Sequence, residues 1–399
     1  MNYIHKIYDY FIDYFIDLST NLKKYDISKY GFLPEKCVTD LPTDFVYITN
    51  LLKLFDDSQY KKIIQDLDLQ KQPDLEILNF CQLKYLYSIL SMIIHRYMWN
   101  NLDNIISELP HHIGMLFVDV AKKINIVPCL THASVDLYNW KLIDETIPFS
   151  LDNITTINTM ILDKDSSHES WFYLIMIAIE GIGGDAIIAM EKIYKELYKY
   201  YPSYSIITEE LHKINNIIFE SNKIISRIYE KCDPEVFYNK LRIFLNGTNN
   251  SLFKNGLQIR NTDIILSYTG GSGAQSSLIQ LYDIFFSIKH NCKFLDDMRN
   301  YMPKIHSEYL TYAETRNTIK NFLSNNHLST DECIEITKLF NMCIKNLTKF
   351  RSNHRKLIMD YIMKFVKENT ENKGTGGSNP IEFTTELLNT TISSKINRC

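Results

Sequence analysis

The chain has 399 residues, of which 45% are hydrophobic, so it is long enough to bury a sizeable core and is not a disordered protein. Its 43 Lys and Arg residues against 47 Asp and Glu residues give a formal net charge of −4, with both signs scattered along the chain. This balance provides no basic surface for nucleic acid or for an anionic membrane, so neither partner is expected.

The beginning of the chain does not read as a targeting segment. Residues 1–19 are MNYIHKIYDYFIDYFIDLS, in which Asp and Lys interrupt the apolar residues, whereas a signal peptide needs an uninterrupted apolar centre. The longest apolar stretch, residues 171–179, is much shorter than the roughly 20 residues of a membrane span. The eight cysteines are spread singly, without a CxxC pair, and are expected to be reduced. We therefore expect a soluble, cytoplasmic protein.

The first part of the chain predicts a smaller domain of mixed structure. Apolar residues three and four positions apart predict an amphipathic helix over residues 74–99, and Leu109 with Pro110 precedes a second helix. After Pro128 the pattern breaks into loops with short extended pieces, as far as about Asp163. We place a domain boundary there, which divides the chain into an N-terminal domain of residues 1–163 and a larger domain of residues 164–399.

Helical periodicity dominates the larger domain. Helices are expected over residues 171–200, 209–231, 234–245, 274–289 and 332–367, whereas residues 246–273, rich in Asn and Gly, are expected to form a long surface loop. Only 13 glycines and 10 prolines occur in the chain, which also favours long helices over a turn-rich β architecture. The predicted fold class is mainly α, with an all-helical C-terminal domain.

His354 is the strongest candidate for a functional residue in the last long helix. It follows Phe350 by four residues and precedes Leu357 by three, so it lies within the apolar stripe and points inward. A lone histidine on an apolar face is usually a core residue with satisfied hydrogen bonds. The other interpretation is an axial haem ligand, which requires one neutral imidazole in an apolar pocket. On the residues alone, both interpretations stay open.

Three charged residues are further candidates. Arg351, one turn before His354, could pair with a haem propionate. Asp283 is a lone carboxylate in LIQLYDIFF and could accept a hydrogen bond from the second ring nitrogen of His354, unless it lies on the polar edge of its helix. Arg242, in PEVFYNKLRIFL, is either snorkelling or positioned to bind a carboxylate.

Other motifs carry less information. Residues 268–277, YTGGSGAQSS, are glycine-rich and open a helix, so their backbone amides could bind an anion, but no Walker loop is present. The absence of HExxH, GxSxG and kinase signatures argues against those enzyme classes. His111, His112 and His306 are further candidate ligands, of which the adjacent pair is expected on the surface.

Five fragments, in their order and spacing, closely resemble the indoleamine 2,3-dioxygenase family. They are LRIFLNG, GGSGAQSS followed by YDIFF, FLDDMRNYMPKIH, LTKFRSNHRKLI and KGTGGSNPIEF. The resemblance continues upstream through ELPHHIG, VPCLTHASVDLYNW and SWFYLIMIAIE, and before residue 108 its main trace is GFLP. It therefore covers nearly the whole chain.

The resemblance implies a haem b between the two domains, with the smaller domain covering the distal side. It makes His354 the ligand of an iron that is ferrous when active, with Asp283 as the acceptor behind it and Arg351 near the propionates. Gly271 and Ser272 would pass over the distal haem face. By the same mapping Arg242 would bind the substrate carboxylate, and the remaining substrate-pocket residues would be Phe237, Leu245, Phe172, Tyr173, Phe117, Met176, Ser272, Gly273, Thr375 and Gly376.

The implied activity is cleavage of the indole 2,3 bond of L-tryptophan by dioxygen to give N-formylkynurenine, a step of tryptophan catabolism in the kynurenine pathway. No side chain is implied as a catalytic acid or base, because the haem and dioxygen carry the chemistry. An electron donor for the haem and a monomeric state are also implied. Two alternatives remain: a non-catalytic haem protein that binds or senses dioxygen, and an enzyme that acts on another indole.

Three positions depart from the family pattern as animal members typically show it. Phe117 stands where a tyrosine is typical and Met176 where a serine is typical, while Ser272-Gly273-Ala274 replaces Ser-Ala-Gly. The first two changes remove hydroxyl groups from the implied pocket, and Gly273 removes a methyl group. We therefore leave the substrate preference open while keeping the reaction class.

Overall fold

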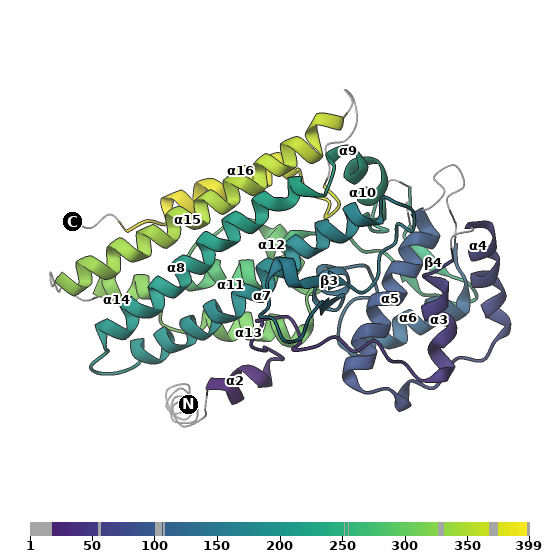
Figure 1. The fold of residues 1–399 in the computed structure, drawn as a ribbon, viewed down its shortest axis with the longest axis horizontal. Coiled ribbons are helices and arrows are strands. Elements are labelled where there is room, and N and C mark those ends of the chain that lie inside the picture. The colour runs from purple at the N-terminus through teal and green to yellow at the C-terminus, as the bar shows by residue number, and fades with distance from the viewer. Residues whose placement is uncertain are drawn as a thin grey trace.

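The computed structural model describes residues 18–54, 57–99, 106, 108–250, 252–253, 255–325, 331–366 and 374–396. The mainly α class is confirmed, because long helices make up most of both parts of the molecule (Figure 1). Residues 1–17, which include most of the segment tested above for a signal peptide, lie outside the described residues.

The smaller part is built around one buried helix. Its helices are α3 (Val46–Leu51), α4 (Asp57–Asp66), α5 (Phe80–Trp99) and α6 (His111–Lys123), whereas α2 (Leu18–Lys24) lies beneath the other part of the molecule (Figure 1). Every residue of α5 from Leu83 onward is buried, including the charged and polar ones. Buried polar groups need partners, and His95 finds one 2.8 Å away in the backbone carbonyl of Phe244. The helix is thereby fixed to the end of α10 (Arg242–Phe244) in the other part of the chain.

Short strands cross the expected domain boundary. β1 (Glu108–Leu109) pairs in parallel with β4 (Leu257–Ile259), which pairs antiparallel with β5 (Ile265–Leu266). The stretch 246–273, expected as a surface loop, therefore contributes two strands, of which β4 packs against α6 (Figure 1). A second, two-stranded sheet joins β2 (Trp140–Leu142) and β3 (Ile154–Thr156). The division at residue 163 stays a prediction. The pairing of β1 with β4 shows that a segment from after residue 163 forms a sheet with a segment from before it.

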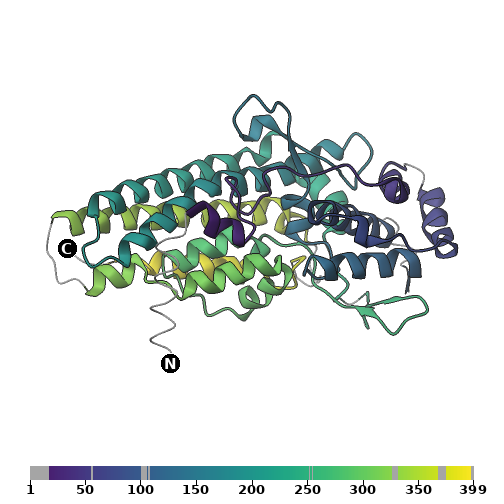
Figure 2. The same cartoon turned by 90° about the horizontal axis from the view of Figure 1, so that it is seen from below.

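The larger part is a bundle of long helices (Figure 2). α7 (Ser166–Leu197) packs against α8 (Tyr204–Ser226), α8 against α15 (Asp331–Tyr361), and α15 against α16 (Pro380–Ser393). The remaining helices are α9 (Pro234–Val236), α11 (Ser277–Phe285), α12 (Lys293–Met298), α13 (Lys304–Glu314) and α14 (Ile319–Asn325). The predicted helices are thus found, with shifted ends. α8, for example, begins earlier than expected because Ser203 caps it by accepting a hydrogen bond from the amide of Ile206.

α7 is the central helix of this bundle. By length and composition it could cross a membrane, but 72% of its most apolar window is buried inside the protein. This is the character of a core helix that is apolar all round because other helices surround it.

The segment directly before α10, Phe237–Leu241, is a π-helix, a widened helical turn that is frequent at functional sites.

Candidate active site

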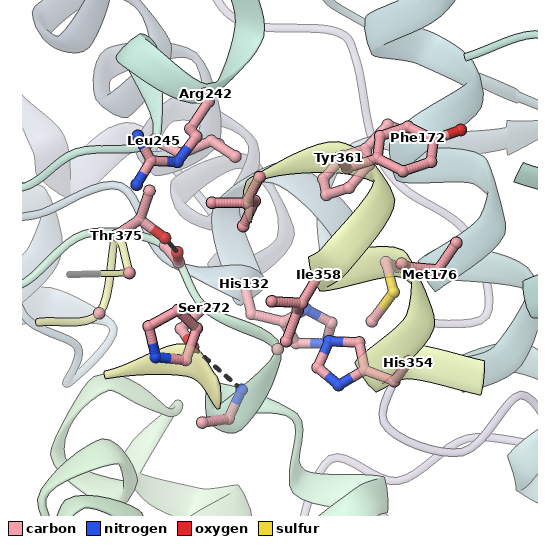
Figure 3. Close-up of a pocket in the computed structure, with 18 of the residues that line it drawn as sticks. His132, Phe172, Met176, Arg242, Leu245, Ser272, His354, Ile358, Tyr361 and Thr375 are labelled. Atoms are coloured by element: carbon pink, nitrogen blue, oxygen red, sulfur yellow. Dashed lines mark hydrogen bonds between the residues drawn. The ribbon is translucent and has the colours of Figure 1, made fainter. Parts of the chain in front are cut away.

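One large cavity lies where α7, α15 and the Phe237–Leu241 turn face a glycine-rich segment at residues 271–274 (Figure 3). It holds about 1300 Å³ of space free of protein atoms, part of it open to solvent. The predicted site residues that line it are Phe172, Tyr173, Met176, Phe237, Arg242, Leu245, Gly271, Ser272, Gly273, His354, Thr375 and Gly376.

His354 reaches the cavity from α15. Its side chain is exposed and lines the cavity, as expected for an imidazole that can bind a ligand there. Desolvation, assisted by the positive charge of Arg351, lowers the pKa of His354 to about 4. The imidazole is therefore neutral near neutral pH, which is the form that ligates a metal. Among the described residues, no group of three or more His, Cys, Asp or Glu side chains offers a site for a bare metal ion.

Arg242 enters the cavity at a different place, beside Leu245 and Thr375 (Figure 3). It is half-buried, and desolvation lowers the pKa of its guanidinium, which lies 5.3 Å from the centre of the Tyr238 ring. The rings of Phe172 and Phe237, which also line the cavity, pack together with 4.9 Å between their centres. An arginine beside aromatic rings suits a ligand with a carboxylate at one end and a flat apolar group at the other.

The glycine-rich segment is bound to the loop that carries Thr375. The amide of Gly270 donates to the carbonyl oxygen of Thr375 at 3.0 Å, and the Thr375 hydroxyl donates to the carbonyl oxygen of Gly271 at 2.7 Å. The amide of Gly271 donates in turn to the carbonyl oxygen of Leu245 at 3.0 Å. The cavity wall near Arg242 is therefore made of backbone whose polar groups are already hydrogen-bonded to one another.

Gly270 is required by this close packing, whereas Gly273 is not. A Cβ atom at position 270 would lie 1.9 Å from the carbonyl oxygen of Leu245, but at position 273 it would meet only the Met176 methyl group, at 4.0 Å. We expect Gly270→Ala to lower the free energy of unfolding by about 1–3 kcal/mol or more, because backbone must move to relieve the clash. Gly273→Ala should change it by less than about 0.5 kcal/mol. Urea unfolding of both variants tests this, and equal losses would contradict it.

Three predicted residues do not line the cavity. Phe117 packs on Tyr87, with 5.5 Å between ring centres, and faces the core of the smaller part. Arg351 and Asp283 are buried and bonded to each other, and Asp283 also lies 3.1 Å from His290. Arg351 additionally donates to the carbonyl oxygen of Leu387 at 3.1 Å, which ties α15 to α16. The charges of Arg351 and Asp283 are thus paired between α15 and α11. Contact of either residue with a cofactor stays a prediction.

The adjacent histidines and His306 are also placed differently. His112 is buried, contrary to the expected surface position, because its ring nitrogen Nε2 lies 2.8 Å from the Tyr47 hydroxyl. His306 is enclosed in the core with its ring 4.8 Å from that of Phe32. Neither residue lines the cavity, so neither is a ligand in this site.

A polar cluster in the cavity wall was not predicted from the sequence. His132 and Asp136 line the cavity from the π-helical turn Ala133–Leu137 and its N-cap, with 2.6 Å between Nδ1 of His132 and Oδ2 of Asp136. Nε2 of His132 lies 3.0 Å from Glu180 on α7. The spacing of four residues between His132 and Asp136 would place both side chains on one face of a helix, but the sequence pattern predicts loops for this stretch. Burial acts to lower the pKa of His132, yet the two carboxylates outweigh it and raise it to about 10.

A mainly helical protein in which a single neutral histidine enters a large apolar cavity has the construction of a protein that ligates haem from one side. The sequence profile of the family described as indoleamine 2,3-dioxygenase matches residues 21–394. The chain therefore belongs to the indoleamine 2,3-dioxygenase family, whose members are haem-dependent dioxygenases of tryptophan and related indoles.

Similar proteins come from distant organisms. An indoleamine 2,3-dioxygenase of Saccharomyces cerevisiae is 29% identical, over 88% of this chain and 79% of the relative. Indoleamine 2,3-dioxygenase 1 of Mus musculus is 27% identical, over 90% of this chain and 92% of the relative. A 6-hydroxytryptophan 2,3-dioxygenase of Fusarium equiseti is 27% identical, over 95% of this chain and 98% of the relative. The similarity thus spans both parts of the molecule.

Proposed function

We propose that the protein cleaves the indole 2,3 bond of L-tryptophan with dioxygen to give N-formylkynurenine, as a step of tryptophan catabolism in the kynurenine pathway. The observation that carries this proposal is the presence of His354 and Arg242 in one cavity. A haem held by His354 and a substrate held through its carboxylate by Arg242 would then share that cavity. The proposal includes haem b, an electron donor that keeps its iron ferrous, a monomeric state and a cytoplasmic location.

The residues present fit a haem. His354 would hold its iron, because the imidazole is neutral and accessible from the cavity. Gly271, Ser272 and Gly273 line the same cavity, and these small residues would leave room beside the haem for a gas molecule and a substrate. When bound, the haem supplies the activation of dioxygen, which no side chain can provide.

The chain's own residues bind and orient the substrate. Arg242 would form paired hydrogen bonds with the amino-acid carboxylate. Phe172, Tyr173 and Phe237 would pack against the indole and exclude water from the ring. The loop of Thr375 and Gly376, already bonded to the glycine-rich segment, would cover the amino-acid end of the substrate. The chain thus fixes the position of the ring, which is the main contribution that a protein makes to cofactor chemistry.

Two other functions remain to be separated by experiment. A related indole is a second candidate substrate, since one relative is named a 6-hydroxytryptophan 2,3-dioxygenase. A non-catalytic haem protein that stores or senses dioxygen is less well supported, because such a protein has no use for an arginine in the pocket.

The direct test is the absorption spectrum and steady-state activity of protein produced with a haem supply. We expect a Soret band and turnover of L-tryptophan to N-formylkynurenine in the presence of a reductant. Reversible binding of dioxygen without turnover of any indole would favour the storage function. A protein that binds no haem would contradict the proposal altogether.

A further inference from the structure

The cluster of His132, Asp136 and Glu180 places charge in a cavity whose walls are otherwise mostly apolar. His132 is 3%, Asp136 4% and Glu180 2% exposed. One imidazolium is shared by two carboxylates, and the Ser276 hydroxyl also donates to Glu180. The amide of His132 donates to the side-chain oxygen of Gln275 at 2.9 Å, so the cluster is bound to the glycine-rich segment as well.

Asp136 is left with an unused acceptor. Its Oδ2 is taken by His132, but its Oδ1 has no hydrogen-bond partner among the described residues. A buried carboxylate oxygen without a donor is costly, and exceptions of this kind in a folded protein call for an explanation. Oδ1 is itself buried, and the Tyr173 hydroxyl and Oε2 of Glu180 also lack a hydrogen-bond partner among the described residues. Because Asp136, unlike Glu180, lines the cavity, a ligand there is one source of the missing donor.

The position of the cluster indicates which part of a substrate it would meet. Figure 3 shows Arg242, Leu245 and Thr375 together, and His132 separate from them, nearer to Ile358 and His354. If Arg242 binds the carboxylate of an indole amino acid, the amino-acid end is held away from the cluster. The donor that remains for Asp136 is then on the ring, either the indole N–H or a ring hydroxyl.

We propose that Asp136 is a specificity-determining residue that accepts a hydrogen bond from a donor on the edge of the indole ring. This inference rests on the proposed function, since it assumes an indole amino acid bound through Arg242. His132 is a positioning residue in this arrangement, because it holds Oδ2 of Asp136 and so orients the carboxylate. An indole that places an N–H or O–H group at Asp136 is preferred to an analogue that lacks it.

The haem-loaded wild-type protein provides the first test. Dissociation constants, from the change in haem absorption, and kcat/KM would be measured for L-tryptophan, its 1-methyl derivative, and its 5-hydroxy and 6-hydroxy derivatives. We expect about 10- to 100-fold discrimination, the range for a hydrogen bond to a charged group. A loss on 1-methylation identifies the ring N–H as the donor, and a gain with one hydroxy isomer identifies the hydroxyl. Binding of all four compounds within about threefold would overturn the inference.

Variants separate hydrogen bonding from shape. Asp136→Asn keeps the size of the side chain and can still accept from His132, but it turns an NH2 group toward the place of Oδ1, so the discrimination should vanish or invert. Asp136→Val removes the acceptor, and any loss on 1-methylation that persists in this variant is steric and counts against the inference. Glu210→Gln makes the same chemical change on a buried carboxylate outside both the cavity and the cluster, and it should keep the wild-type discrimination.

The results also separate this inference from the proposed function. If haem-loaded wild type binds none of the four compounds, the proposed function fails and the inference with it. If it binds and oxidises tryptophan but Asp136→Asn discriminates as wild type does, only the inference fails. Should Asp136→Asn not fold, the wild-type series and the Asp136→Val variant still decide. Equal effects of Glu210→Gln and Asp136→Asn would show a general loss of packing and not a hydrogen bond to the ligand, and would overturn the inference.

Discussion

Replacement of His354 by alanine is expected to abolish stable haem binding. His354 is the one described histidine that the structure leaves accessible in the cavity as a neutral imidazole, because His132 is held between two carboxylates. Loss of a hydrogen bond to such a ligand already costs about 10- to 100-fold in affinity, so loss of the ligand itself should cost more. The measurement is the haem retained after gel filtration, from the ratio of Soret to protein absorbance.

A matched control distinguishes ligation from general damage. His212 is exposed on the neighbouring helix α8, so His212→Ala should keep full haem retention. Free imidazole should partly restore haem binding to His354→Ala, because it can occupy the space of the deleted ring. Wild-type retention by His354→Ala without added imidazole would remove His354 from the role of ligand.

Replacement of Arg242 by alanine is expected to leave the haem spectrum nearly intact and to cripple the turnover of tryptophan. The guanidinium is half-buried in a mostly apolar wall, so a substrate carboxylate there would lose its charged partner. Removing one member of a buried, hydrogen-bonded charge pair costs about 2–5 kcal/mol, or roughly 30-fold to several thousand-fold in affinity or rate. The measurement is kcat/KM for L-tryptophan under air with a reductant.

Tryptamine provides the control, because it lacks the carboxylate. If Arg242 binds that group, the penalty of Arg242→Ala should largely vanish with tryptamine, and Arg242→Lys should lie between wild type and alanine on tryptophan. Equal penalties on both compounds would indicate a structural arginine that packs on Tyr238. Full activity of Arg242→Ala on tryptophan would exclude Arg242 from the site.

The two predictions depend on features that local sequence patterns already revealed. The apolar stripe of the helix now seen as Asp331–Tyr361 placed His354 on the inward face, and the ring does enter the cavity. The resemblance of the ordered fragments brought Arg242 and Thr375 into one pocket, although more than a hundred residues separate them in the chain. Periodicity is a local property, so it could identify the helices and the buried face of each.

The sequence did not reveal what each buried face meets. Phe117 was expected in the pocket, but α6 turns it toward Tyr87. The role of Asp283 as the acceptor behind His354 stays a prediction. Its pairing with Arg351 was not foreseen, because that contact depends on how α11 and α15 are placed against each other. Likewise, the pairing of β1 with β4 joins residues that are far apart in sequence and too short in pattern to be recognised as strands.

The sequence by itself determined the helical class, because periodicity is recorded along one chain. The resemblance of its ordered fragments indicated the family, and with it the residues that are proposed to hold a haem and an amino acid. Only the tertiary structure decided that His132 and Asp136, which line the cavity, meet Glu180 behind them, since a π-helical turn and a distant helix must come together to form the cluster. A buried charge is stable only where partners of opposite charge or hydrogen-bonding groups surround it. Such partners come from distant parts of the chain, so a local sequence pattern cannot reveal them.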